Sequence, residues 1–194
     1  NEVWKVVADK QVSARAKARL LDGLIQSKRE RGIDSMPSLA ILSHILADRN
    51  KMVKRSAIEA AGEFVVKGAD LILRNMEASN DLDSESRQRL YWALGRYRSW
   101  LNESVIMARI ASLNDIEKEA NLASHLVRIN PGVAALHASR LIRKAPNEST
   151  SWMPLVRGFI KEKRSLVALE QVLTHHQIPS SAARAVLNEI GASG

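Results

Sequence analysis

The sequence of 194 residues contains no cysteine. Disulfide bonds, thiolate metal sites, a thiol nucleophile and a Cys-x-x-Cys-His haem attachment are therefore excluded within this chain. No apolar run reaches the roughly 20 residues that a transmembrane helix needs, so we expect no membrane insertion. Gly-rich phosphate loops, nucleophile elbows and zinc signatures are also missing. We therefore predict that this chain is not an enzyme and holds neither a cofactor nor a metal ion.

Aromatic residues are scarce, at 4% of the chain, although 45% of the residues are hydrophobic. Most of the apolar residues are Ala, Leu, Ile and Val, a composition that suits helices approaching one another closely. These residues recur at helical spacing, and turn or capping residues separate the stretches. Twelve helices are predicted, at about 2–8, 13–29, 38–47, 48–64, 69–78, 84–98, 102–112, 115–128, 132–144, 151–163, 165–175 and 180–191.

Two of these stretches resemble each other. Residues 48–62 and 81–95 each begin with an acidic residue, carry basic residues in their first turns and close with Ala-Ala-Gly or Ala-Leu-Gly. A recurrence at this period is typical of stacked helical pairs. We therefore predict an all-α fold: a right-handed α-solenoid of about six antiparallel helix pairs, HEAT-like or armadillo-like, in one domain over residues 1–194.

Three kinds of polar residue invite a chemical role. None of the five histidines has a metal-ligand partner at i+4. We expect His44 to be packed or hydrogen-bonded between Ile41 and Ile45, and His175 to cap a helix. The carboxylate pairs Asp81/Asp83 and Glu117/Glu119 lie at predicted helix starts, where we expect capping. Basic clusters at helix ends, 140–144 and 161–164, are interpreted as complementing the helix dipole.

The net charge of +8 raises the question of nucleic-acid binding. The excess of Lys and Arg is spread over both halves of the chain, which favours a mildly basic, solvated surface. Nucleic acid is therefore a possible partner that we do not favour over a protein partner or neighbouring domains.

The predicted interaction surface consists of Arg89, Trp92 and Arg96 on the helix 84–98. Trp92 projects away from the apolar face of that helix, and the two arginines flank it at i−3 and i+4. Such a stripe could anchor a partner, since Trp and Arg dominate interface energetics. Alternatively, Trp92 packs on the adjacent repeat and the arginines cover its faces.

The stretches Arg55-Ser-Ala-Ile-Glu-Ala-Ala-Gly62, Trp152-Met-Pro-Leu-Val-Arg-Gly-Phe-Ile-Lys161 and Leu166-Val-Ala-Leu-Glu-Gln-Val-Leu173 carry a family resemblance. They are similar to the HEAT-like region of multidomain proteins of planctomycete-type bacteria, where a dehydrogenase-like β-propeller precedes the region and a cytochrome c domain follows. The resemblance implies an exported, periplasmic spacer or scaffold module, with a cytoplasmic location as the alternative. The start at Asn1, without Met or a signal-like segment, also suggests a piece of a larger protein.

A second resemblance points to another class. The HEAT-type alkylpurine DNA glycosylases are basic and use aromatic and charged residues on a concave face, which Arg89, Trp92 and Arg96 would suit. Glu85 is the nearest carboxylate to that stripe. The predicted function is a non-catalytic repeat module for protein binding or domain spacing, and nucleic-acid binding of the glycosylase type is the alternative.

Overall fold

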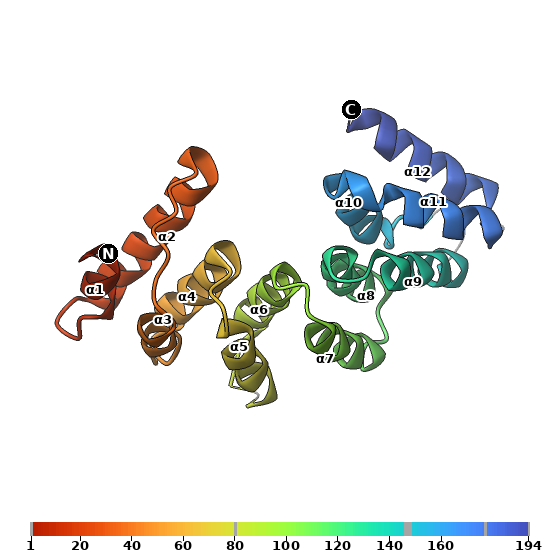
Figure 1. The fold of residues 1–194 in the computed structure, drawn as a ribbon. Helices are drawn as coiled ribbons and strands as arrows, with labels where there is room; N and C mark the ends of the chain where they lie inside the picture. The colour runs from red at the N-terminus through yellow and green to blue at the C-terminus, as the bar shows by residue number, and fades with distance from the viewer. Residues whose placement is uncertain (1, 80, 146–148, 177, 194) are drawn as a thin grey trace. The chain divides into compact units, whose positions relative to one another are not determined.

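The computed structural model describes residues 2–79, 81–145, 149–176 and 178–193. In these ranges the chain forms twelve α-helices, two 3-10 helices and no strand, so the all-α class is confirmed (Figure 1). The helices are α1 (Glu2–Ala8), α2 (Ala14–Arg31), α3 (Leu39–Leu46), α4 (Lys51–Phe64), α5 (Ala69–Ala78), α6 (Ser84–Arg96), α7 (Trp100–Ala111), α8 (Ile116–Ala123), η1 (Ser124–Arg128), α9 (Pro131–Lys144), α10 (Met153–Lys161), η2 (Lys163–Ser165), α11 (Leu166–His175) and α12 (Ser180–Ala192).

Side-chain caps fix several helix starts: α6 begins at Ser84 as predicted, and α4 begins at Lys51, three residues after its predicted start at 48. The Asn50 side chain accepts from the N–H groups of Met52 and Val53 at the start of α4. Asp83 caps α6, and the Ser86 N–H, followed by the Arg55 guanidinium, holds the pKa of that carboxyl well below its usual range. Local capping therefore accounts for these boundaries.

The prediction that Glu119 acts as a cap is wrong. Asp115 caps α8 instead, by accepting from the Lys118 N–H at 2.9 Å. Glu119 is only 2% exposed and pairs with Arg140 at 2.6 Å and Lys144 at 3.2 Å, both from α9. A buried carboxylate needs charged partners, and these two basic residues stabilise it rather than a helix end.

The chain divides into two compact units, Asn1–Tyr97 and Arg98–Gly194. Unit 1 consists of three helical pairs, α1–α2, α3–α4 and α5–α6. The second helices of these pairs (α2, α4 and α6) pack side by side in one layer, and the first helices (α1, α3 and α5) form the other (Figure 1). Trp4 and Phe64 fill the core between layers, with ring centroids 5.3 Å apart in an edge-to-face arrangement. Unit 1 therefore has the alternating two-layer packing of helical pairs, whereas one continuous solenoid over both units stays a prediction.

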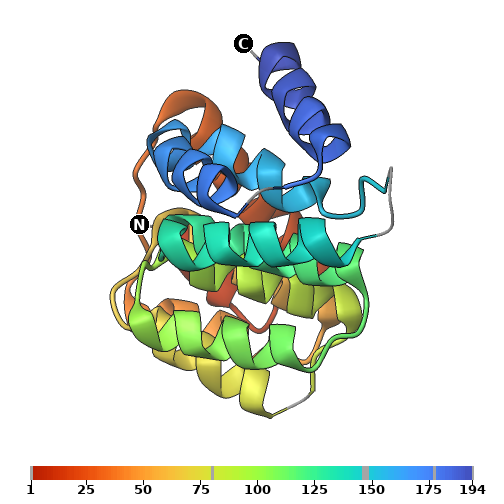
Figure 2. The same ribbon diagram turned by 90° about the vertical axis from the view of Figure 1, so that its right-hand side faces the viewer.

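In unit 2, α8 packs on α10 and α9 packs on α11, and α12 contacts α10. Figure 2 shows α11 lying on α9. The predicted helix 115–128 is interrupted here, because α8 ends at Ala123 and the chain continues as the 3-10 helix η1. Gly158 of α10 approaches Ser124 so closely that an added Cβ would lie 3.1 Å from the Ser124 Cβ. The α-helix therefore gives way to the 3-10 helix at the point where the chain meets α10 at close range.

Over the described ranges, none of the helices combines the length and the apolar character needed to cross a bilayer.

Candidate functional site

The three predicted site residues lie on α6 beside α4, inside the layer of second helices. The ring of Trp92 rests on Gly62 of α4, where an added Cβ would lie only 2.6 Å from the Trp92 Cζ3. The guanidinium carbons of Arg29 and Arg96 lie 5.7 and 5.9 Å from the centre of this ring. Trp92 is half-buried. These contacts are those of packing between neighbouring helices, with arginines covering the ring.

Arg89 belongs to a network of ion pairs across the same layer, which we call the charged ladder (Arg29, Arg55, Glu59, Glu63, Glu85 and Arg89). Arg29 of α2 donates to Glu59 at 2.9 Å and to Glu63 at 3.0 Å, both on α4. Arg89 of α6 also pairs with Glu59, and with Glu85 at 3.0 Å. The ladder therefore links α2, α4 and α6 through alternating charges.

The structure thus brings Trp92 and Arg96 together and gives Arg89 carboxylate partners of its own. Arg96 donates to the Gly62 backbone carbonyl of α4 at 3.4 Å, and Glu63 pairs with Arg29. Patterns within a single helix could not supply Arg29, which comes from another helix pair.

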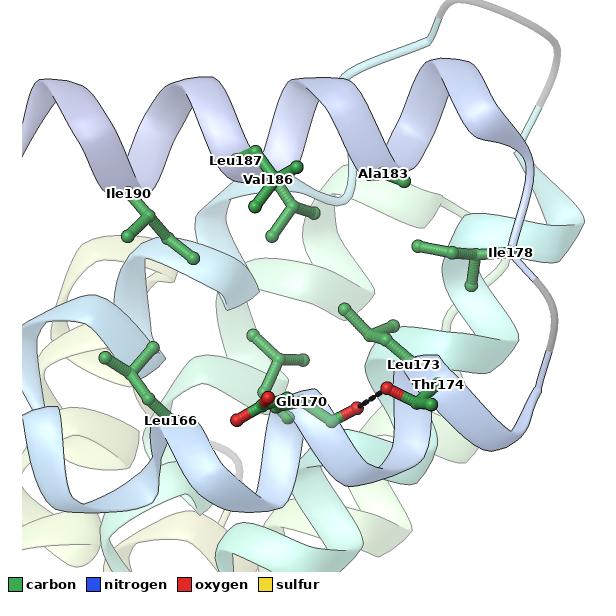
Figure 3. A pocket seen from close by; sticks show the side chains of 10 residues that line it. Leu166, Glu170, Leu173, Thr174, Ile178, Ala183, Val186, Leu187 and Ile190 are labelled. Atoms are coloured by element: carbon green, nitrogen blue, oxygen red, sulfur yellow. Dashed lines mark hydrogen bonds between the residues drawn. The ribbon is translucent and has the colours of Figure 1, made fainter.

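A different feature presents an open apolar surface: the α11–α12 groove in unit 2, with a volume of about 510 Å³. Figure 3 shows side chains of the two helices facing each other across it. The lining residues are Leu166, Leu169, Glu170, Leu173, Thr174, Ile178, Ala183, Val186, Leu187 and Ile190.

The groove has a buried floor and an exposed rim. Leu169 and Val186 are 2% and 5% exposed, whereas Leu187 is 68% exposed. The Thr174 hydroxyl donates to the Glu170 backbone carbonyl at 2.8 Å. The Glu170 carboxylate takes no part in this bond and is the charged group of the lining. Apolar spacing along both helices predicted a buried face, but sequence alone gave no sign that the two faces stand apart.

The histidines differ in their exposure to solvent: His125 and His137 are partly buried, and His44 and His175 are exposed. Burial lowers the pKa of His125, in η1, to about 4. His44 is exposed, so the prediction that it packs among apolar neighbours is wrong. The ring of His175 contacts the Gln171 carbonyl at 2.6 Å, at the end of α11 as expected. Within the described ranges, no three His, Asp or Glu side chains gather in a way that could hold a metal ion.

Comparisons of this chain with protein-family models, with curated proteins and with solved structures found no match.

Proposed function

We propose that this chain is a non-catalytic helical-repeat module that binds a partner protein through the α11–α12 groove. The observation that carries the proposal is an apolar groove of about 510 Å³ whose rim residue Leu187 is 68% exposed. Leaving a large apolar side chain in water costs free energy that a partner's apolar surface would recover. The stacked helices of unit 2 hold both walls of the groove.

The occupant that fits is an amphipathic helix. The lining runs from Leu166 to Leu173 along α11, about 10 Å at 1.5 Å per residue, which matches two turns of a bound helix. A helix that enters an apolar groove presents anchors at i, i+3, i+4 and i+7. Glu170 on the rim favours a Lys or Arg beside that apolar stripe. We therefore assign the groove to a basic amphipathic helix of another protein or a neighbouring domain.

The test uses a synthetic amphipathic helix with Leu at i, i+3, i+4 and i+7 and Lys at its edge, followed by fluorescence anisotropy. We expect Leu187→Glu to weaken binding at least about tenfold, because truncation or charging of a groove anchor typically costs 2 kcal/mol or more. The matched control is Leu136→Glu, which changes an exposed leucine of α9 outside the groove.

Two results would overturn the proposal. Equal loss of binding in Leu136→Glu and Leu187→Glu would show that the peptide binds apolar surface without using the groove. Concentration-dependent dimers in sedimentation, abolished by Leu187→Glu, would show that a second copy of the chain occupies it instead.

The wider setting of the module follows from the resemblance to HEAT-like regions, and we propose a scaffold or spacer role in a larger, exported protein. The full-length gene tests this placement, because it would encode a propeller or cytochrome domain beside the module.

The glycosylase alternative needs Trp92 open to a nucleobase. The contacts of its ring with Gly62, Arg29 and Arg96 speak for the protein-binding proposal.

A further inference from the structure

A second pocket of unit 2, which we call the basic pocket, has a volume of about 530 Å³ and a lining rich in cations. It lies where the end of α10 and η2 meet the end of η1 and the start of α9. The lining residues are Arg98, Val127, Arg128, Pro131, Lys161, Glu162, Lys163, Arg164 and Ser165. It shares none of them with the α11–α12 groove, so it concerns a separate function.

The charges of the basic pocket do not balance. Its five cations face one carboxylate, Glu162, which is already paired with Arg128. Within the described part of the chain, none of the other four cations has a carboxylate partner. The charged ladder of unit 1 is the opposite case, because its arginines are paired with glutamates. An excess of positive charge on a concave surface raises the local concentration of anions.

The helix dipole does not explain this cluster. The sequence places 161–164 at a helix end, but α10 ends at Lys161, and Lys163 and Arg164 belong to η2. The dipole of α10 therefore accounts for Lys161 at most, since the effect falls off within the last turn. The dipole of α10 therefore leaves the other cations of the pocket unexplained.

Internal contacts hold the turn and one of the arginines that line the pocket, while the other four cations are exposed. The Ser165 hydroxyl and backbone N–H both donate to the Glu162 carbonyl, at 2.6 and 2.7 Å, and close the turn that carries Lys163 and Arg164. The pair with Glu162 holds the guanidinium of Arg128. Arg98 has a left-handed backbone with φ of 48°, a conformation that is costly for a residue other than glycine. An ordered turn and a held Arg128 before binding lower the entropic cost of fixing these parts around a ligand.

We infer that the basic pocket binds an oligophosphate group, meaning two or more linked phosphoryl units. Guanidinium groups hold phosphate oxygens in pairs, and lysines add compact point charges. Four unpaired cations exceed what a single carboxylate or monophosphate would neutralise, whereas a chain of phosphoryl units matches them. Val127 and Pro131 give the pocket an apolar side for the rest of such a ligand. The same chemistry occurs in a free polyphosphate and in a nucleic-acid backbone.

The experiment is titration calorimetry of the purified chain with inorganic tripolyphosphate at low salt. We expect Lys163→Ala combined with Arg164→Ala to weaken binding at least about tenfold, because hydrogen bonds to charged groups are the strong ones. The matched control is Lys118→Ala combined with Arg184→Ala, which removes the same charge from exposed positions of unit 2 outside the pocket. Equal weakening in both double variants, or no binding by the parent chain, would overturn the inference.

A further variant separates binding from folding. Arg98→Asn removes a pocket cation but keeps a residue that tolerates the left-handed backbone. We expect weaker tripolyphosphate binding with an unchanged Tm, and full binding by this variant would remove Arg98 from the site and contradict the proposed charge set. Repeating the titration with a single-stranded eight-residue oligothymidylate distinguishes the two phosphate sources. Tighter binding of the oligonucleotide supports a nucleic-acid backbone as the ligand, and tighter binding of tripolyphosphate supports a small oligophosphate.

Discussion

The closest approach of α4 and α6 depends on one missing methyl group, at Gly62. A Cβ added there would lie 2.6 Å from the Trp92 Cζ3, 2.8 Å from the Ala93 Cα and 2.9 Å from the Ala93 Cβ. All three distances are below ordinary van der Waals contact. The Trp92 ring could rotate, but the Ala93 Cα belongs to the backbone of α6 and moves only with the helix. Gly62→Ala must therefore push α4 and α6 apart.

The expected magnitude follows from two opposing effects. In a helix interior, Gly→Ala ordinarily stabilises by up to about 1 kcal/mol. Overpacking a core of this density costs about 1–3 kcal/mol, and here it also disturbs the Trp92 contact and the charged ladder. The backbone contact places Gly62→Ala at the upper end of that range, so we expect a net loss of about 2 kcal/mol. For a chain of this size, that loss lowers the Tm by about 4–8 °C.

The assay is a pair of thermal melts followed by circular dichroism, supported by urea unfolding. The matched control is Gly23→Ala in α2, where an added Cβ meets nothing within 4 Å. Gly23→Ala should stabilise the chain by about 0.5–1 kcal/mol, so the two substitutions change the free energy of unfolding in opposite directions. A Gly62→Ala variant as stable as Gly23→Ala would refute the close approach of α4 and α6.

Making Gly62→Ala in a Trp92→Ala chain identifies which of these contacts sets the requirement for glycine. In Trp92→Ala the ring contact at Gly62 is gone, but the contact with the Ala93 backbone remains. Gly62→Ala should therefore still destabilise in that background, though by less than in the parent chain. Full rescue would show that the ring alone, and not the helix separation, sets the requirement for glycine.

Two other predictions follow from single side chains. Trp92→Ala should lower stability by about 3 kcal/mol, because a packed Trp is lost, and a melt within a degree of the parent would instead leave Trp92 free for a partner. His125 has its pKa lowered to about 4 by burial, so it stays neutral in the folded chain while the unfolded chain binds a proton below about pH 6.5. The contribution of His125 to stability should be full above pH 6.5 and be lost towards pH 4, by up to about 3 kcal/mol in urea titrations. His125→Gln should flatten that fall, whereas His175→Gln, at an exposed position, should retain it.

The sequence by itself determined the helices of this protein. Periodicity and a cap such as Asp83 act over a few residues, and the predicted helix starts agree with the structure to within about three residues. The repeat of residues 48–62 at 81–95 likewise predicted that α4 and α6 play equivalent parts, and both lie in the layer of second helices in unit 1. Local signals suffice here because each helix forms its hydrogen bonds within itself.

Tertiary structure alone decided what the side chains meet. Arg29 pairs with Glu59 and Glu63 from 30 and 34 residues away, and Glu119 turned from an expected cap into a buried partner of α9. The α11–α12 groove and the basic pocket depend on the spacing and rotation of helices about their axes. A single sequence encodes which residues share one helix face, but the distance between two faces is set by the packing of all the neighbouring helices together.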